Sequence, residues 1–250
     1  MILFVSPHLD DIALSCGGIV HRLAHSGEQV IIATLCTADA PAGQLLSPSA
    51  QHEHWQWQLG AQPYQFRRQE DERMAALLGA QPVHLGLLDA IYRHDGEGAP
   101  LYEGKQFMAG QVHPWDWAHQ LPAVLAALQG VLDAHHPQRV FCPLTAGGHV
   151  DHIIARRAVE QLCDARTLAY YEDYPYAQKD AAALARLLSQ GQDWRPMLIQ
   201  LSEEEILTRI AAINCYQSQL FAVFGDASTM PARVREYIAF TGGERYWERM

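Results

Sequence analysis

The sequence predicts a single α/β domain in which a Rossmann-like, mostly parallel sheet carries helices on both faces. Short apolar runs alternate with longer helical stretches along all 250 residues, and this alternation is typical of parallel sheets. Hydrophobic residues make up 49% of the chain and charged residues 18%, which suits a packed globular protein. No linker, internal repeat or low-complexity segment divides the chain, so we expect one domain over residues 1–250.

The first half of the chain contains three expected strands separated by helices. The apolar run Ile2–Val5 predicts the first strand, and the helix after it should end at Gly27, because glycine commonly terminates helices. Pro63 should break the second helical stretch, which ends at Gly79. The expected elements are a strand at 2–5, a helix at 12–26, a strand at 28–37, a loop at 39–51, a helical stretch to 78, a strand at 82–87 and an irregular segment at 88–120.

The second half continues the alternation. Its apolar runs are short and bounded by turn residues, as expected of buried strands in a parallel sheet. The expected elements are a helix at 121–135, a strand at 139–144, a helix at 153–164, a strand at 168–173, a helix at 177–190, a last strand at 197–201 and helices at 203–217 and 231–239.

The composition disfavours several kinds of partner and location. The formal net charge is −10 and no basic run occurs, so nucleic acid and anionic membrane surfaces are not expected partners. The five cysteines are scattered without CxxC spacing, which favours reduced thiols in a cytoplasmic protein. No apolar run is long enough to span a membrane, and Asp10 and Asp11 interrupt the apolar N-terminus, which disfavours a signal peptide.

Two polar loops that follow expected strands carry the candidate site. The first is Ser6–Asp11 and the second is Thr145–His152, and each leads into a helix. In open α/β sheets ligands bind at the carboxyl ends of the strands, so we expect the two loops to meet. A single Asp at such a position is usually a helix cap, but two acids with a nearby histidine need a further explanation. The side chains expected to converge are His8, Asp10, Asp11, His149, Asp151 and His152.

These residue types predict a catalytic metal site. Two imidazoles and one carboxylate leave positions open for water and substrate, as in catalytic zinc sites, and the same set can hold Fe²⁺. Because Asp10 and Asp11 are adjacent and point in different directions, one should bind the metal while the other acts on a metal-bound water. One of His149 and His152 should likewise bind the metal while the other polarises or protonates the substrate. The GxGxxG, GxSxG and P-loop patterns are absent from the sequence, which disfavours dinucleotide binding, a nucleophilic serine and a nucleotide-phosphate loop.

The two motifs resemble those of the PIG-L/LmbE family of metal-dependent N-deacetylases, which act mostly on compounds that contain N-acetylglucosamine. The similarity lies in Pro7-His8-x-Asp10-Asp11 and His149-x-Asp151-His152, in their order, and in the strand, motif and helix context of each. Weaker matches extend the resemblance over residues 2–165, namely Arg67-x-x-Glu70 and Leu85-Gly86.

The resemblance implies a reaction and a role for each site residue. The protein would be a zinc-dependent hydrolase, with Fe²⁺ as the alternative metal, that removes an acetyl group from an N-acetylated amino sugar or glycoconjugate. The implied roles are metal ligand for His8, Asp11 and His152, general base for Asp10, oxyanion stabilisation or amine protonation for His149, tuning of the His149 charge for Asp151, and substrate contact for Arg67.

Some positions depart from the family pattern. Leu9 and Ile12 replace a proline and a glutamate that are not metal ligands in the family, so the metal site should persist. Gly147 stands where some members carry an aromatic hydroxyl, so a hydroxyl that holds the oxyanion must come from elsewhere. The candidates for that hydroxyl are Tyr92, Tyr171, Tyr174 and Tyr176.

Several alternatives stay open at the level of sequence. The part from 166 to 250 shows no resemblance and is expected to complete the fold and the substrate site. Arg67 and Glu70 fit an ion pair on a helix surface as well as a substrate contact. An inactive relative that keeps the metal or the sugar is the alternative function, and the aromatic residues near the C-terminus allow a homo-oligomer. Expected as turn or surface residues are Asp89, His52 and His54.

Overall fold

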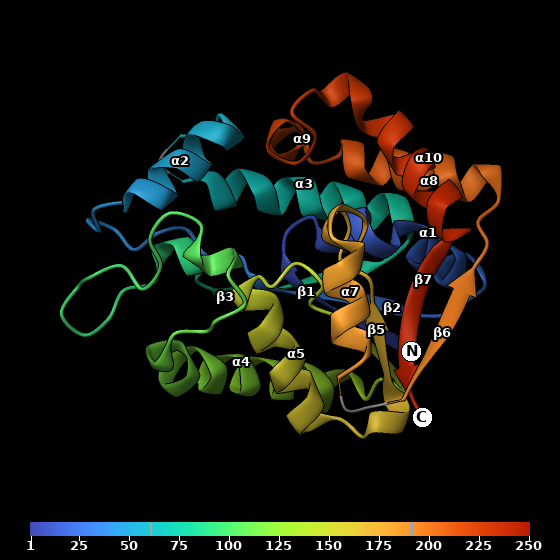
Figure 1. The fold of residues 1–250 in the computed structure, drawn as a ribbon, viewed down its shortest axis with the longest axis horizontal. Helices are drawn as coiled ribbons and strands as arrows, with labels where there is room; N and C mark the ends of the chain where they lie inside the picture. The colour runs from blue at the N-terminus through green and yellow to red at the C-terminus, as the bar shows by residue number, and fades with distance from the viewer. Residues whose placement is uncertain (61, 191–192) are drawn as a thin grey trace.

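The computed structural model describes residues 1–60, 62–190 and 193–250 of the protein. Seven strands of these residues form one sheet in the order β3-β2-β1-β4-β5-β7-β6 (Figure 1). All neighbouring pairs are parallel except those made by β7, which runs antiparallel to β5 and β6. The strands are β1 (Ile2–His8), β2 (Val30–Cys36), β3 (Gln81–Leu87), β4 (Arg139–Pro143), β5 (Leu168–Tyr171), β6 (Trp194–Ile199) and β7 (Glu244–Arg249).

Helices cover both faces of the sheet, as the sequence predicts (Figure 1). None of those in the described ranges is long and apolar enough to cross a bilayer. One face is covered by α1 (Asp11–His25), α2 (Pro48–Trp57), α3 (Pro63–Leu78), α8 (Glu203–Asn214), α9 (Gln217–Phe224) and α10 (Met230–Thr241). The other face is covered by α4 (Pro114–His135), α5 (Val150–Leu162) and α7 (Ala181–Leu188), and short helices lie at η1 (Ala90–Tyr92), η2 (Gln106–Met108), η3 (Ala165–Thr167), α6 (Tyr176–Lys179) and η4 (Ala227–Thr229).

The central strand β1 is buried on both sides of the sheet. Ile2 and Phe4 pack into the core beneath α1, whereas Leu3 and Val5 pack into the core on the α4 and α5 side. Alternation of side chains along a strand sends neighbouring residues to opposite faces, so a continuous apolar run fits a strand covered twice. The C-terminal end of β1 therefore lies in the middle of the sheet, next to the end of β4.

Three helices begin at least three residues earlier than the sequence predicts. The α2 helix starts at Pro48, within the segment 39–51 that is predicted to be a loop. The expected irregular segment at 88–120 ends at Pro114, where α4 starts with a proline in its first turn, a favoured position. Pro122 lies inside this helix. In a sequence, a proline usually indicates the first turn of a helix rather than its interior, which is why the predicted start is at 121. The α5 helix starts at Val150 rather than 153, which places Asp151 and His152 in its first turn.

The C-terminal part differs from expectation by one strand and one helix. The predicted strand at 197–201 corresponds to β6 but is not the last strand, because β7 follows and pairs with it along its whole length. The α9 helix is also additional. The β7 strand has two charged, two aromatic and two charged residues in succession, a pattern without the alternation typical of a strand, and its strand state depends on pairing with β5 and β6.

A buried ion pair ties the end of the chain to the first helix. Glu244 at the start of β7 accepts the backbone N–H groups of Gly18 and Ile19 at 2.9 Å and 2.6 Å. The α1 helix is interrupted at Cys16 (φ −149°, ψ 28°), so Glu244 supplies acceptors next to the interruption. Arg209 of α8 lies 3.3 Å from Glu244, and both side chains are fully buried. The C-terminal part thereby holds the helix that begins at the candidate site.

Candidate active site

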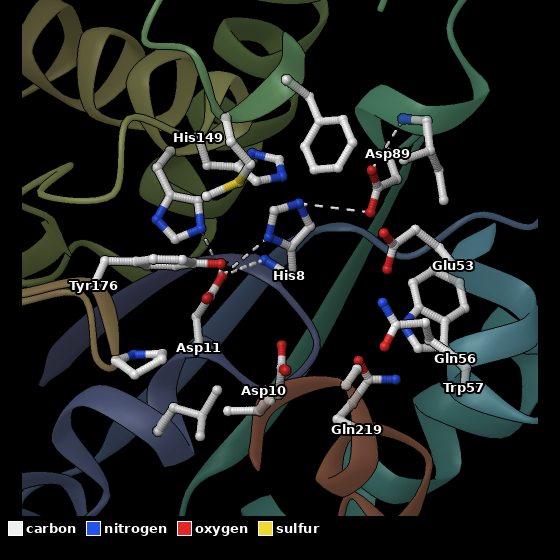
Figure 2. Close-up of a pocket in the computed structure, with 18 of the residues that line it drawn as sticks. His8, Asp10, Asp11, Glu53, Gln56, Trp57, Asp89, His149, Tyr176 and Gln219 are labelled. Atoms are coloured by element: carbon white, nitrogen blue, oxygen red, sulfur yellow. Dashed lines mark hydrogen bonds and ion pairs between the residues drawn. The ribbon is translucent and has the colours of Figure 1, made fainter. Parts of the chain in front are cut away.

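Asp10 and Asp11 lie where β1 ends and α1 begins. Asp10 occupies the position before the helix with a φ of 155°, but its side chain makes no capping hydrogen bond. Asp11 accepts the backbone N–H of His8 at 2.8 Å. Figure 2 shows both carboxylates at the cavity, at different places. The helix-cap interpretation is therefore wrong for Asp10, whose carboxylate is left free to face the cavity.

His8, Asp11 and His152 converge on one point. Asp11 Oδ2 lies 3.3 Å from His8 Nδ1 and 3.3 Å from His152 Nε2. At most 11% of any of these three side chains is exposed, so the group is shielded from bulk water. Although burial lowers it, Asp11 and Asp173 raise the pKa of His152 to about 10. Such a preference for positive charge, together with two imidazoles and a carboxylate, fits a divalent metal ion.

A carboxylate lies behind each of these two histidines. His8 Nε2 is 3.1 Å from Asp151 Oδ2, and His152 Nδ1 is 2.6 Å from Asp173 Oδ1. A carboxylate on one ring nitrogen fixes the tautomer and leaves the other nitrogen free for a metal. The nitrogens left free, His8 Nδ1 and His152 Nε2, are those that face Asp11. The geometry is therefore that of two oriented metal-binding histidines.

His149 is the third imidazole of the cluster, and the groups around it determine the charge of its ring. Its Nδ1 accepts the backbone N–H of Asp151 at 3.1 Å, while the Asp151 carboxylate lies 3.9 Å away. Burial and then the neighbouring His8 lower the pKa of His149 well below its ordinary value. Asp151 raises this pKa, as its expected role requires, but burial and His8 outweigh its effect, and the carboxylate also lies 3.1 Å from His8 Nε2. A neutral His149 whose Nδ1 accepts the Asp151 N–H would carry its proton on Nε2.

Asp151 is held in place by the segment that the sequence predicts to be irregular. Arg93 Nη1 donates to Asp151 Oδ1 at 2.5 Å, and the backbone N–H of Ala90 donates to Asp151 Oδ2 at 3.1 Å. Arg93 Nη2 also donates to Asp116 Oδ2 at 2.8 Å, at the start of α4. These contacts fix the carboxylate behind His8, so the segment after β3 contributes to the site from outside the motifs.

Arg67 lies next to Asp10 rather than on the helix surface. Arg67 Nη2 is 3.6 Å from Asp10 Oδ1 and donates to the Leu9 carbonyl at 3.2 Å. Glu70 instead accepts the N–H and hydroxyl of Ser218 on α9, so the proposed surface pair between Arg67 and Glu70 is wrong. Burial raises the pKa of Asp10 to about 7, against the effect of Arg67, which lowers it.

The structure ranks the four tyrosines. The Tyr92 hydroxyl is bonded to His54, and the Tyr171 hydroxyl donates to the Val5 carbonyl. Tyr174 stacks on Tyr237 with ring centroids 4.8 Å apart. Tyr174 and Tyr176 both line the cavity. After burial, the charges of Asp11 and Asp10 raise the pKa of the Tyr176 hydroxyl, whereas Arg209 and Arg233 oppose the rise at Tyr174. In Figure 2 the Tyr176 ring extends across the cavity toward Asp11.

These side chains share one cavity of about 280 Å³, which the two motifs and the C-terminal part enclose together. Asp151 does not line the cavity, whereas the other five predicted motif residues and Arg67 do. Figure 2 shows Glu53, Gln56 and Trp57 of α2 on the side opposite Tyr176. Residues that line it from the C-terminal part are Tyr174, Pro175, Tyr176, Lys179, Gln219, Ala222 and Val223.

Some contributing residues lie outside the motifs. Asp173 follows β5 directly, so the rule that sites form at the carboxyl ends of parallel strands could have found it. Asp89 caps η1 as a turn residue does, and it also lies 3.6 Å from His8 Nε2. His54 is buried and bonded to Tyr92, so its expected surface position is wrong. No short-range pattern marks Glu53, which the packing of α2 brings to the cavity.

Within the described part of the chain, two groups of side chains have donor atoms close enough to share a metal ion, namely His8 with His149 and His152, and His8 with Cys36 and Asp151. Burial raises the pKa of the Cys36 thiol well above its ordinary value, so this sulfur is protonated and a poor ligand. The Asp151 carboxylate is already occupied by Arg93 and Ala90. The other group shares His8 and His152 with the convergence described above, where Asp11 Oδ2 lies 3.3 Å from a ring nitrogen of each.

Comparison with known proteins agrees with this geometry. A family model described as PIG-L, GlcNAc-PI de-N-acetylase, matches residues 3–163. A 2'-N-acetylparomamine deacetylase from Streptomyces fradiae is 30% identical over 227 residues, which cover 87% of this chain and 72% of the relative. A protein of the same name from Niallia circulans is 25% identical over 237 residues, which cover 90% and 82%.

The structural similarity extends over the whole chain. The crystal structure of the zinc-inhibited form of teicoplanin deacetylase Orf2 is 28% identical and superposes with a TM-score of 0.84, covering 100% of this chain and 97% of the other. The part from 166 to 250, which shows no resemblance in its motifs, thus has a counterpart in that structure. With its two motifs brought together at the end of β1 and its first 163 residues matched by the family model, this chain belongs to the PIG-L family.

Proposed function

We propose that this protein is a metal-dependent hydrolase that removes the acetyl group from an N-acetylated amino sugar or glycoconjugate. The observation that carries the proposal is the Asp10 carboxylate, which is free of capping bonds and faces the same cavity as His8, Asp11 and His152. The names of the relatives support an N-deacetylase reaction.

The metal would be held by His8, Asp11 and His152. Bound there, a divalent ion supplies Lewis acidity and lowers the pKa of water. We propose Zn²⁺, with Fe²⁺ as the alternative that the same donors accept. Because one relative is known in a zinc-inhibited form, the amount of zinc added is part of any assay.

Asp10 is the proposed general base. Burial brings its pKa to about 7, so the carboxylate takes up a proton from the attacking water near neutral pH. The protonated Asp10 then passes this proton to the nitrogen that leaves, because an amide anion is a poor leaving group. In this scheme Arg67 acts through Asp10, since its guanidinium opposes the rise of the Asp10 pKa.

His149 and Tyr176 are the proposed donors to the oxyanion. His149 Nδ1 is occupied by a backbone N–H, which places the proton of a neutral ring on Nε2. Burial and Asp11 raise the pKa of the Tyr176 hydroxyl, so it keeps its proton and donates. Donors fixed before the charge develops stabilise a tetrahedral intermediate without reorganisation.

The test is acetate release from N-acetylated amino sugars by protein loaded with one equivalent of Zn²⁺ or Fe²⁺. We expect release with one of the metals, loss of release with a chelator, and recovery when metal is restored. Asp10→Asn protein that retains its metal serves as the control, because an amide cannot accept the proton. Release that persists in metal-free protein, or no release from any N-acetylated sugar with either metal, would contradict the proposal.

A further inference from the structure

The two lysines of this chain lie at the same cavity. Lysine and arginine together number 18, and only Lys105 and Lys179 are lysines. Lys105 precedes η2, and Lys179 is the last residue of α6. Although they are far apart in the sequence, both line the cavity that holds Asp10 and His8.

The lysines differ from the arginines in their partners. Arginines of this chain bind carboxylates closely, as in Arg22 with Glu205 at 2.6 Å and Arg93 with Asp116 at 2.8 Å. Within the described residues, neither Lys105 nor Lys179 is within ion-pair distance of a carboxylate. The ammonium groups at the cavity are therefore left for another partner.

The cations at this side of the cavity also repel one another. The pKa of Lys179 is lowered first by burial and then by Arg233 and Lys105. Arg233 of α10 donates to the Phe224 carbonyl and, among the described residues, to no carboxylate. Glu53 partly balances Lys105, but the like charges of Lys105, Lys179 and Arg233 still oppose one another, and binding of an anion reduces that cost.

Among the described residues, the acidic groups of the cavity form no ion pair with either lysine. Asp11 belongs to the metal group, Asp10 lies next to Arg67, and Glu53 lies on the side opposite Tyr176 (Figure 2). Tyr176 belongs to the same short helix as Lys179. Lys105 lies near enough to Glu53 of α2 to lower the pKa of that carboxyl group, but among the described residues it forms no ion pair with it.

We propose that the substrate carries an anionic group, a phosphate or a carboxylate, and that Lys105 and Lys179 bind it. This inference rests on the proposed function, because it names the class of N-acetylated amino sugar that the same cavity accepts. Ammonium groups bind either oxyanion through charge-assisted hydrogen bonds. The compound named for two relatives, 2'-N-acetylparomamine, carries amines instead, so it is a cationic substrate with which the anionic substrates can be compared.

The first experiment compares substrates of different charge on the metal-loaded enzyme. Acetate release is measured for N-acetylglucosamine 1-phosphate and 6-phosphate, N-acetylmuramic acid, the neutral methyl glycoside of N-acetylglucosamine, and 2'-N-acetylparomamine. We expect kcat/KM for at least one anionic substrate to exceed that of the neutral one by on the order of 10- to 100-fold. The preference between phosphate and carboxylate identifies the anion. An equal or higher kcat/KM for the neutral and cationic compounds would overturn the inference.

Variants then assign the preference to the lysines. Lys105→Gln and Lys179→Gln should each raise KM for the anionic substrate with little change in kcat, and the double variant should abolish the preference. Activity toward the neutral glycoside should remain. Arg166→Gln is the control for the change in net charge, because Arg166 is 90% exposed and outside the cavity. A double variant that still prefers the anionic substrate shows that the lysines do not bind it.

Binding separates this inference from the proposed function. Calorimetric titration of the metal-loaded protein with glucosamine 6-phosphate and with glucosamine needs no turnover. Tighter binding of the phosphate, lost in the double variant and weakened by salt, supports the lysine site even if no acetate is released. Equal binding of the two compounds overturns the inference whether or not the protein is a deacetylase.

Discussion

The ring of Tyr176 occupies the space that a side chain at Gly147 would need. A Cβ atom built at Gly147 would lie 2.4 Å from Tyr176 Cγ and 2.6 Å from Tyr176 Cδ2. Real Cβ atoms do not approach other carbons so closely, so the inward position of the Tyr176 ring requires glycine at 147. The second motif lacks an aromatic hydroxyl at 147, and a tyrosine from α6 lies over that position instead.

The Tyr176 hydroxyl should therefore matter for turnover. Tyr176→Phe keeps the ring over Gly147 and removes only the hydroxyl, so fold and metal content should be unchanged. We expect kcat to fall on the order of 10²-fold, as when one oxyanion donor is removed. Tyr174→Phe is the matched control, since after burial the pKa of Tyr174 responds to Arg209 and Arg233 rather than to the metal group. Equal kcat values for the two variants would remove Tyr176 from the mechanism.

Metal affinity should depend on Asp173 as well as on the motif histidines. His8→Ala and His152→Ala should lose the metal, as measured by elemental analysis of protein purified without chelator. Asp173→Asn keeps the size of the side chain but weakens the orientation of His152, so metal affinity should fall roughly 10- to 100-fold. Asp164→Asn, at an exposed position, is the control. Undiminished metal in the two histidine variants would refute the assigned ligands.

The decrease of kcat at low pH should follow the protonation of Asp10. Burial raises its pKa to about 7, and a base must be ionised to accept a proton, so kcat should fall as the pH drops below about 7. Arg67 lowers that pKa, so Arg67→Met should move the fall to higher pH, whereas Arg67→Lys should keep it near its original position. Asp10→Asn should reduce kcat by ~10²–10⁴-fold with metal retained. A profile that is the same in Arg67→Met and the unmodified enzyme would show that another group titrates.

The pair of Arg209 and Glu244 should dominate the stability of the C-terminal part. Glu244→Ala leaves Arg209 and two backbone N–H groups without their acceptor in a buried place, and breaking such a pair costs about 3–5 kcal/mol. Chemical denaturation should show this loss in the free energy of unfolding. Glu203→Ala breaks the exposed pair with Arg235, and because solvent screens such a pair its loss should change the free energy of unfolding little. Similar losses in the two variants would mean that burial adds nothing to the Glu244 pair.

Local patterns in the sequence are sufficient for most of the strands and helices and for the centre of the site, but not for α9 and β7. Apolar runs and helix-ending glycines mark β1, α1, β2 and β3 because these signals act within a few residues. The spacing of His8, Asp11 and His152 predicts that they meet, since the two loops leave neighbouring parallel strands at the same end. The sequence alone therefore predicts that these side chains meet, and it predicts the family.

Only the tertiary structure decides which group faces which. Asp151 follows His149 closely in the sequence, yet its carboxylate is directed to His8, and His152 is oriented by Asp173 of a different strand end. The strand β7, the placement of Tyr176 over Gly147 and the meeting of Lys105 with Lys179 likewise depend on contacts between segments far apart in the chain. Motif spacing fixes positions along the chain, whereas the direction of a side chain depends on packing and on the charges that surround it.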